Sequence, residues 1–268
     1  MKTIRTTEMN RIQKLFTKKK TSILNVFYTA GFPNLNDTVV IAQQLEKAGA
    51  DIIEIGIPFS DPIADGPVIQ ESNKVALDNG MTLKKLLAQV KEIRATVNLP
   101  IILMGYLNPV MQYGIENFCK DSAAAGVDGM ILPDMPMEEY QTEYKSLFES
   151  HDLSNTFLIS PTTSEKRIRQ IDEATNGFIY AVSASSTTGA KTGFDVEQVE
   201  YFKKLKSLNL KNPFLIGFGI SNHETFSKAT EYGAGAIVGS AFITMLKDSK
   251  DFKNDILKFV TRLKNPNA

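Results

Sequence analysis

Short runs of apolar residues alternate along the chain with longer stretches in which apolar positions recur at helical spacing. Most of the short runs are apolar at consecutive positions, which is typical of strands buried on both faces of a parallel sheet. Eight runs predict strands at Ile23–Thr29, Ile52–Ile55, Ile101–Met104, Gly129–Leu132, Thr156–Ile159, Phe178–Val182, Phe214–Gly217 and Ala236–Val238.

The stretches between these runs predict helices that alternate with the strands. A further helical stretch, Pro67–Asn79, follows the second strand, and spaced apolar residues such as Ile12 and Phe16 predict a short amphipathic helix within residues 1–20. The regular helices are predicted at Leu35–Ala48, Leu83–Val97, Ile115–Ala125, Glu138–Ser150, Glu165–Ala174, Val196–Leu208, His223–Tyr232 and, after the last strand, Asp251–Leu263.

A weak internal repeat favours a closed barrel. Helical stretches run into Gly49, Gly126 and Gly233, and a strand begins almost at once after each. Such a recurrent unit is typical of a (β/α)₈ barrel. A doubly wound open sheet is the alternative, but no G-x-G-x-x-G follows the first strand. We therefore predict an α/β protein, a (β/α)₈ TIM barrel over residues 1–268 as one domain, with residues 1–20 as a helix that caps the barrel.

The composition narrows the class of protein. Thirty Lys and Arg residues balance thirty Asp and Glu residues, so the formal net charge is zero and a strongly basic nucleic-acid binder is excluded. Cys119 is the one cysteine, which excludes a disulfide framework and a multi-cysteine metal site. No apolar segment reaches the length of a membrane span, and residues 1–20 lack a signal-peptide pattern. We expect a cytoplasmic protein.

The residues at the strand ends favour acid–base chemistry by carboxylates. No lysine stands there for a Schiff base, and the two histidines, His151 and His223, have no metal-ligand company. Glu54 lies in an otherwise apolar strand, where alternation places it on the side of Ile52. Loss of hydration raises the pKa of such a carboxyl group, which suits a residue that both gives and takes a proton. A salt-bridged structural glutamate is the alternative.

The loop after the second strand carries two more carboxylates, Asp61 and Asp65. Because Pro67 suits the first position of a helix, Asp65 could cap that helix instead of acting in catalysis. Asp61 could simply form a turn before proline. The residues alone leave both alternatives open.

Glycine-rich turns follow the last two strands and predict a phosphate site. Gly219 belongs to the first turn, and Gly239 and Ser240 to the second. Barrels often bind phosphate with these two loops and a helix N-terminus, because backbone N–H groups can approach the anion closely. Gly189, in a small and polar loop after the sixth strand, could close over the phosphate; ordinary tight turns are the alternative.

Six motifs occur along the chain, the longest of them EIGIPFSDPIADGP at residues 54–67. The others are YTAGFP at 28–33, MGYLNP at 104–109, PDMP at 133–136, GFGIS at 217–221 and VGSA at 238–241. Together they resemble one known family, the tryptophan synthase α subunit. The longest motif matches the signature of that family almost letter for letter, and the order and spacing agree over essentially the whole chain.

The resemblance implies retro-aldol cleavage of indole-3-glycerol phosphate to indole and glyceraldehyde 3-phosphate, without metal or cofactor. Glu54 would protonate the indole C3 and take the proton of the glycerol hydroxyl, while Asp65 would accept a hydrogen bond from the indole N–H. By the same resemblance, the substrate pocket would contain Phe27, Met104, Tyr180, Thr188 and Phe218, and the phosphate cradle Gly189, Gly219, Gly239 and Ser240.

The resemblance also implies a partner, a pyridoxal-phosphate (PLP) β subunit that receives indole through a tunnel in an α₂β₂ heterotetramer. The PLP belongs to that partner. The loops facing it would carry Pro58, Asp61, Asn108, Pro109 and Pro136.

One stretch departs from the family pattern: Ser186-Thr187-Thr188-Gly189 stands where the family usually has Gly-Val-Thr-Gly. Loss of a glycine could stiffen this loop. Two further hypotheses remain: a binding protein that mainly activates its β partner, and another phosphosugar isomerase or lyase on the same barrel. The intact Glu54 and Asp65 pair counts against the first, and the match around Glu54 against the second.

Overall fold

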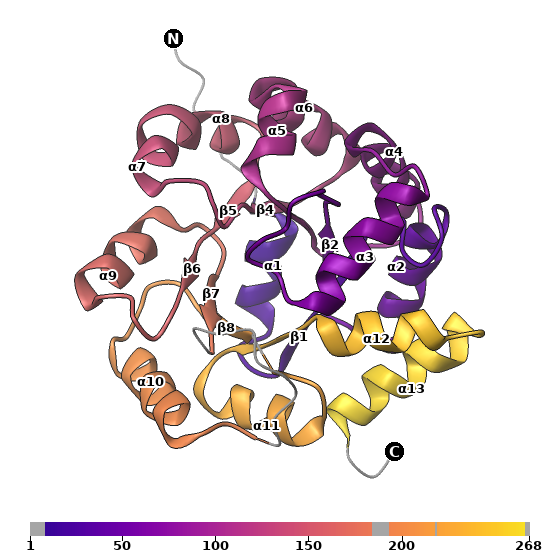
Figure 1. Ribbon diagram of the computed structural model, residues 1–268. Coiled ribbons are helices and arrows are strands. Elements are labelled where there is room, and N and C mark those ends of the chain that lie inside the picture. The colour runs from indigo at the N-terminus through magenta and orange to yellow at the C-terminus, as the bar shows by residue number, and fades with distance from the viewer. Residues whose placement is uncertain (1–8, 184–192, 218, 266–268) are drawn as a thin grey trace.

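The computed structural model describes residues 9–183, 193–217 and 219–265, which form a nearly closed parallel barrel surrounded by helices. The strands are arranged in the order β5-β4-β3-β2-β1-β9-β8-β7-β6, and every pair is parallel. Figure 1 shows the helices as a ring around the strands. The strands are β1 (Ile23–Thr29), β2 (Ile52–Gly56), β3 (Ile101–Met104), β4 (Gly129–Ile131), β5 (Ser154–Thr156), β6 (Leu158–Ile159), β7 (Ile179–Val182), β8 (Phe214–Gly217) and β9 (Gly235–Val238).

The strand predicted at Thr156–Ile159 begins two residues earlier, at Ser154, and is divided into two short strands. β5 pairs with β4, whereas β6 pairs with β7, and Phe157 lies between them. The Phe157 carbonyl accepts a hydrogen bond from the Tyr180 N–H at 3.0 Å. The chain therefore changes partners at Phe157 and occupies one of eight positions around the barrel, so the prediction of a (β/α)₈ barrel is confirmed although nine strands are counted.

Alternate residues along a strand belong to two different hydrophobic cores: an inner core inside the barrel and an outer core between the strands and the helices. The inner core gathers Ile52, Ile102 and Ile131 from neighbouring strands, with further residues from β1, β7, β8 and β9. The outer core packs strand residues such as Ile53 and Ile55 against the helices. Period-two alternation therefore holds in β2, and Glu54 shares a side with Ile52, as the sequence predicts. The structure shows that this side is the inner one.

Most predicted helices are present within a few residues of their expected ends. The stretch predicted at 138–150 contains a π-helical turn over Tyr140–Tyr144 between two short α-helices. The helices are α1 (Arg11–Lys18), α2 (Asp37–Ala48), α3 (Pro67–Asp78), α4 (Leu83–Arg94), α5 (Leu107–Tyr113), α6 (Ile115–Ala125), α7 (Met137–Glu139), α8 (Lys145–Ser150), α9 (Glu165–Ala174), α10 (Val196–Ser207), α11 (His223–Tyr232), α12 (Ser240–Asp248) and α13 (Phe252–Lys264).

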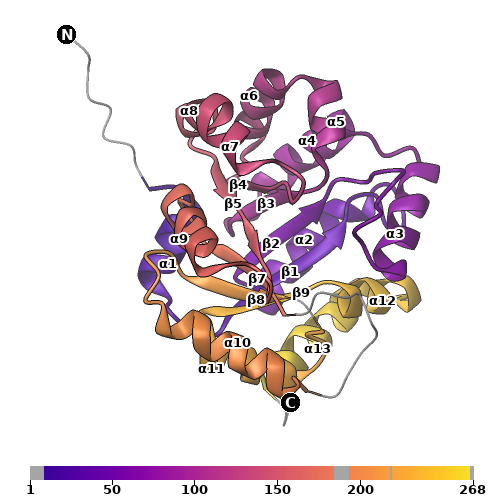
Figure 2. The same ribbon diagram turned by 60° about the vertical axis from the view of Figure 1, so that its left-hand side comes forward.

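Two of these helices were not predicted, and one of them corrects the expected order. α5 follows β3, and α12 lies between β9 and α13, so the helix expected directly after the last strand is the second one there. α12 contacts both β1 and α3, and Figure 2 shows α3 and α12 on the same side of the barrel. The turn Gly239-Ser240 is therefore the start of a helix.

Helix α1 covers the end of the barrel at which the strands begin. Ile12 is fully buried in the inner core, and the ring of Phe16 lies 5.7 Å from that of Phe178. Asn10 forms a capping box with Gln13 at the start of α1. The opposite end of the barrel, at which the strands end, is not covered by α1, and the candidate active site lies there.

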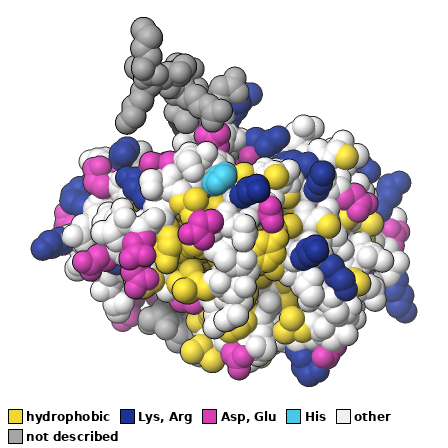
Figure 3. Space-filling model, turned by 90° about the horizontal axis from the view of Figure 1, so that it is seen from above, with side chains coloured by type: hydrophobic (Ala, Val, Ile, Leu, Met, Phe, Trp, Pro, Cys, Tyr) yellow, Lys and Arg dark blue, Asp and Glu magenta, His cyan; other side chains and the backbone are white. Residues whose placement is uncertain are grey.

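The outer surface is mixed in character. Charged side chains are spread over the face in Figure 3, and hydrophobic side chains gather near its middle. Within the described part of the chain, no helix is long and apolar enough to cross a membrane. Cys119 is buried in α6, as expected of a small apolar side chain.

Candidate active site at the carboxyl ends of the strands

Glu54 lies inside the barrel and is fully buried. It stands in register with Phe27 on β1 and Ile102 on β3. Burial raises the pKa of Glu54 to about 8, and a hydrogen bond from Asn25 acts in the opposite direction. The carboxyl group can therefore exchange a proton near neutral pH, as the sequence predicts and as general acid–base catalysis requires. No ion pair of Glu54 is present among the described residues, which removes the salt-bridged alternative.

Asn25 is a polar neighbour of Glu54 that sequence reasoning missed. Its Nδ2 donates a hydrogen bond to Glu54 Oε2 at 2.5 Å. Neither Asn25 Oδ1 nor Glu54 Oε1 has a hydrogen-bond partner among the described residues. One signal was available: Asn25 is the one amide in the apolar run Ile23–Thr29.

Asp65 lies on the loop between β2 and α3 and does not cap that helix. The N-cap residue of α3 is Gly66, which makes no side-chain capping bond. Asp65 Oδ2 instead accepts a hydrogen bond from the Tyr106 hydroxyl at 3.2 Å. Burial raises the pKa of Asp65, against which the Tyr106 bond acts. This geometry removes the capping alternative and leaves the carboxylate available at the barrel mouth.

Tyr180 is an inner residue of β7, and it lies close enough to both carboxylates for their charges to act on it. Burial raises its pKa well above 10, and the charges of Glu54 and Asp65 raise it further. A Cβ built on Gly217 would lie 2.4 Å from Tyr180 Cε2. The glycine on β8 therefore leaves the space that the tyrosine ring occupies.

The other two described pocket candidates lie beside Glu54. Phe27 is half-buried at the mouth, where a Cβ on Gly56 would lie 2.7 Å from its Cζ and one on Gly239 3.5 Å from its Cδ1. Met104 is also half-buried and packs against the inner core. The structure thus brings Phe27, Met104 and Tyr180 to one end of the barrel as an apolar wall.

The predicted phosphate cradle is described at three of its four positions. Gly219 has a φ of +69° and open space where a side chain would be. Gly239 is the N-cap of α12 and makes no side-chain capping bond, so the N–H groups of Ser240 and Ala241 have no side-chain cap among the described residues, while the Phe242 N–H donates to the Gly239 carbonyl. A helix N-terminus with free N–H groups favours an anion. Gly189, together with the pocket candidates Thr188 and Phe218, lies outside the described residues.

The candidates for the partner surface lie on three loops tied to one another. Asp134, on the loop after β4, accepts hydrogen bonds from the Leu107 N–H at 2.9 and 3.1 Å. The rings of Phe59 and Tyr106, on the loops after β2 and β3, lie 5.1 Å apart. Of the candidates themselves, Asp61, Asn108 and Pro136 are exposed, Pro109 is half-buried and Pro58 is buried.

The two histidines lie at helix ends, as expected. His151 is the C-cap residue of α8. His223 begins α11, and its Nδ1 lies 2.8 Å from the Leu263 carbonyl. Both residues therefore serve helix ends.

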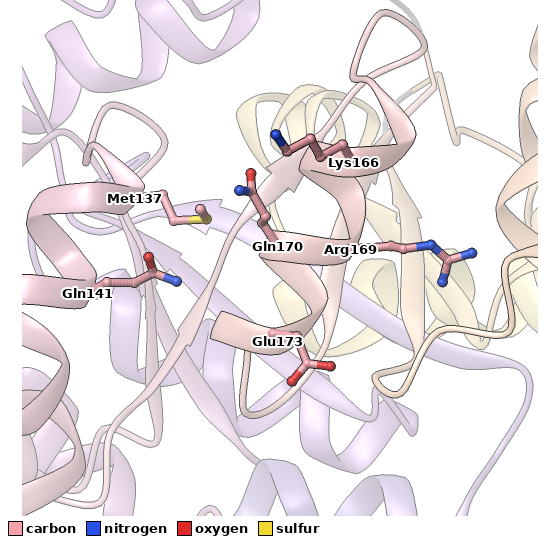
Figure 4. Close-up of a pocket in the computed structure, with 6 residues that line it drawn as sticks. All are labelled: Met137, Gln141, Lys166, Arg169, Gln170 and Glu173. Carbon is pink, nitrogen blue, oxygen red and sulfur yellow. The ribbon is translucent and has the colours of Figure 1, made fainter.

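A separate cavity of about 420 Å³ opens on the outer surface. Figure 4 shows Met137 on α7 and Gln170 on α9 on facing sides of it. Arg169, also on α9, forms an ion pair with Glu165 at 2.8 Å. None of the predicted catalytic residues lines this cavity.

Taken together, a parallel barrel, a buried carboxyl group with a pKa raised to about 8 and a second carboxylate on the loop after the same strand define a barrel enzyme of the acid–base type. The family model described as "Tryptophan synthase alpha chain" matches residues 12–266, and the chain belongs to that family. It is therefore a carbon–carbon lyase that cleaves indole-3-glycerol phosphate to indole and glyceraldehyde 3-phosphate, with indole passed on to a β subunit.

Related proteins match this chain in sequence or structure over nearly their full length. The tryptophan synthase alpha chain of Flavobacterium psychrophilum is 57% identical, over 95% of this chain and 100% of that relative. That of Flavobacterium johnsoniae is 55% identical, over 96% and 100%. The crystal structure of the alpha subunit from Legionella pneumophila superimposes with a TM-score of 0.87 at 35% identity, covering 97% of this chain and 100% of that one.

Proposed function

We propose that Glu54 and Asp65 perform the cleavage, and that this chain needs no metal or cofactor of its own. Glu54 in its acid form gives its proton to C3 of the indole ring, which makes the ring an electron sink. The resulting carboxylate takes the proton of the glycerol hydroxyl as the carbon–carbon bond breaks. One observation above all supports this assignment: Glu54 is fully buried inside the barrel and has a pKa of about 8.

Asp65 stabilises the positive charge that protonation at C3 creates. Its carboxylate accepts the hydrogen bond of the indole N–H, which strengthens as the ring becomes cationic. Tyr106 holds Asp65 Oδ2 and so orients the group. Phe27, Met104 and Tyr180, together with Thr188 and Phe218, enclose the ring and keep water from it.

The phosphate of the substrate is held by backbone N–H groups. Gly219 and the start of α12 at Gly239 and Ser240 supply them, and Gly189 closes over the anion. Zero net charge over the whole chain means that this attraction is local. The uncapped N-terminus of α12 supports the assignment.

The β subunit binds over the loops that follow β2, β3 and β4, in an α₂β₂ heterotetramer in the cytoplasm, and it carries the PLP. Asp61, Asn108, Pro109 and Pro136 contact the partner directly, whereas the buried Pro58 acts by shaping its loop. Two exposed apolar side chains on these segments support the assignment: Ile63 is 90% and Met111 57% exposed.

The central test measures indole released from indole-3-glycerol phosphate, with and without a β subunit. Glu54→Gln keeps the size of the side chain and removes its proton, so we expect no release, and Asp65→Asn should be severely slowed. Glu46→Gln is the matched control, because Glu46 accepts backbone N–H bonds where β3 begins, at the far end of the barrel. Full activity of Glu54→Gln would disprove its role. No release by the unaltered chain in either condition would indicate a purely binding role or another substrate.

A further inference from the structure

Asn25 is a buried amide inside an otherwise apolar barrel interior. It is fully buried, and its register partners are Ile52 on β2 and Ile237 on β9. Burying an amide in such surroundings is costly unless its polar atoms are used. Its Nδ2 donates to Glu54 Oε2 at 2.5 Å, whereas its Oδ1 has no partner among the described residues. The structure therefore directs this amide at Glu54.

We propose that Asn25 is a positioning residue for the cleavage reaction: its amide holds one oxygen of Glu54 and leaves the other, Oε1, for the substrate. This inference rests on the acid–base role of Glu54 proposed above. Asn25 itself touches no reacting atom, and it acts through the carboxyl group. It lies toward the beginning of its strand relative to Phe27, so it supports Glu54 from the side away from the barrel mouth.

The same contact serves both protonation states that the reaction visits. When Glu54 is ionised, Asn25 Nδ2–H donates to its carboxylate. When Glu54 carries the proton on Oε1, its Oε2 is a carbonyl oxygen that still accepts the bond from Nδ2–H. The bond to the charged form is the stronger of the two, so Asn25 favours the ionised carboxylate.

The other groups around Glu54 cannot replace this partner. Tyr180 faces it from β7, and Asp65 lies beyond on the loop after β2, where Tyr106 binds it. On β3 the register partner is the apolar Ile102. Among the described residues, Asn25 makes the one hydrogen bond to the Glu54 carboxyl group.

Removal of the donor should therefore raise the pKa of Glu54 further. A hydrogen bond to a charged group has a strength that corresponds to a shift of about one to two pKa units. Asn25→Leu removes both polar ends at similar volume. Asn25→Asp keeps the shape and an acceptor for the acid form, but two carboxyl groups would then share one proton.

The first experiment titrates Glu54 directly, without substrate. The chain is labelled with glutamate carrying ¹³C at the side-chain carboxyl carbon, and Glu54→Gln identifies the signal. We expect the midpoint to rise by about one to two pH units in Asn25→Leu. In the unaltered chain the side-chain amide signal of Asn25 should titrate with the same midpoint as Glu54. This last measurement holds even if a variant fails to fold.

The second experiment follows the pH dependence of kcat/KM for indole release. The limb that reports Glu54 should move to higher pH in Asn25→Leu, whereas looser packing alone would lower the rate equally at every pH. Asn155→Leu is the matched control: Asn155 is also buried in a strand, with an unpartnered Oδ1, but it stands in register with the outer residue Met130. Its pH profile should not move.

The outcomes separate this proposal from the one on which it rests. An unchanged Glu54 midpoint in folded Asn25→Leu, or an Asn25 amide signal that does not follow Glu54, would overturn the role of Asn25. A shifted Glu54 midpoint with an unchanged pH profile of kcat/KM would support the contact between Asn25 and Glu54. It would count against Glu54 as the acid–base residue.

Discussion

The hydroxyl group of Tyr106 joins two loops by bonding to Asp65. It donates to Asp65 Oδ2 at 3.2 Å and accepts the Ala64 N–H at 3.1 Å. The loop after β2 is thereby fixed to the residue that follows β3. Burial and the nearby Asp65 charge raise the pKa of Tyr106 to about 12, so it remains a donor over the whole working range of pH.

Replacement of Tyr106 by phenylalanine should weaken catalysis, most strongly at low pH. Loss of the donor raises the pKa of Asp65, so less of the carboxylate is present as the pH falls. We expect kcat/KM to fall by about fivefold at neutral pH, as for a partly exposed hydrogen bond to a charge. Tyr113→Phe is the control, because Tyr113 donates to Asp121 at 2.6 Å between α5 and α6. Equal pH profiles for both variants would contradict the prediction.

The Glu54→Gln variant should be more stable than the unaltered chain in alkaline solution. The pKa of Glu54 is raised in the folded protein from 4.5 to about 8, so the folded state holds its proton more tightly than the unfolded state. The resulting stabilisation is fully present below pH 4.5 and is lost as the pH rises through 8. Glutamine does not titrate. We expect the variant's advantage in free energy of unfolding to grow by at least about 1 kcal/mol between pH 5 and pH 9.

Urea unfolding at those two pH values would check this. A difference between the two proteins that does not vary with pH would show that Glu54 is not held in its protonated form.

A side chain at Gly219 should weaken substrate binding through the backbone. Its φ of +69° is unfavourable for alanine, although space is available there. Gly49→Ala is a matched control, because Gly49 has a φ of +91°, open space and a position at the end of α2. Both variants should lose about 1 kcal/mol of stability. Only Gly219→Ala should raise KM for the substrate and weaken inhibition by glycerol phosphate.

The ion pairs of Asp128 should matter for stability and not for the reaction. Its carboxylate is 3% exposed and contacts Arg94 at 2.5 Å and Arg11 at 3.1 Å, at the end of the barrel that α1 covers. Asp128→Asn leaves the largely buried Arg94 without its charge partner, at a cost of about 3 kcal/mol. Thermal unfolding should show the loss, while kcat of the folded fraction stays the same.

The sequence predicted the barrel because its strands are buried on both faces. Runs such as Ile101–Met104 are apolar at every position, and β3 has these same bounds. Glu54 stood out for the same reason, since a carboxylate within such a run has no solvent face. Period-two alternation placed it on the face of Ile52, and the barrel makes that face the inner one.

The division of the fifth strand at Phe157 could not be predicted in this way. β5 is the polar run Ser-Asn-Thr and β6 the apolar pair Leu-Ile, so a search for apolar runs misses the start of β5. The change of pairing partner depends on chain segments far apart in sequence. α12 was missed because it follows β9 without any polar break, through Gly239 alone. The choice between capping and catalysis for Asp65 depended on Tyr106, 41 residues away.

By itself the sequence determined the class of fold, the strand face that Glu54 shares with Ile52 and the order of the loops at the mouth, because each follows from local periodicity and chain order. Tertiary structure alone decided which side chains meet: Asn25 with Glu54, Tyr106 with Asp65, and the ring of Tyr180 over Gly217. These contacts join different strands and loops, and only closure of the sheet into a barrel fixes the register that brings them within hydrogen-bond or packing distance.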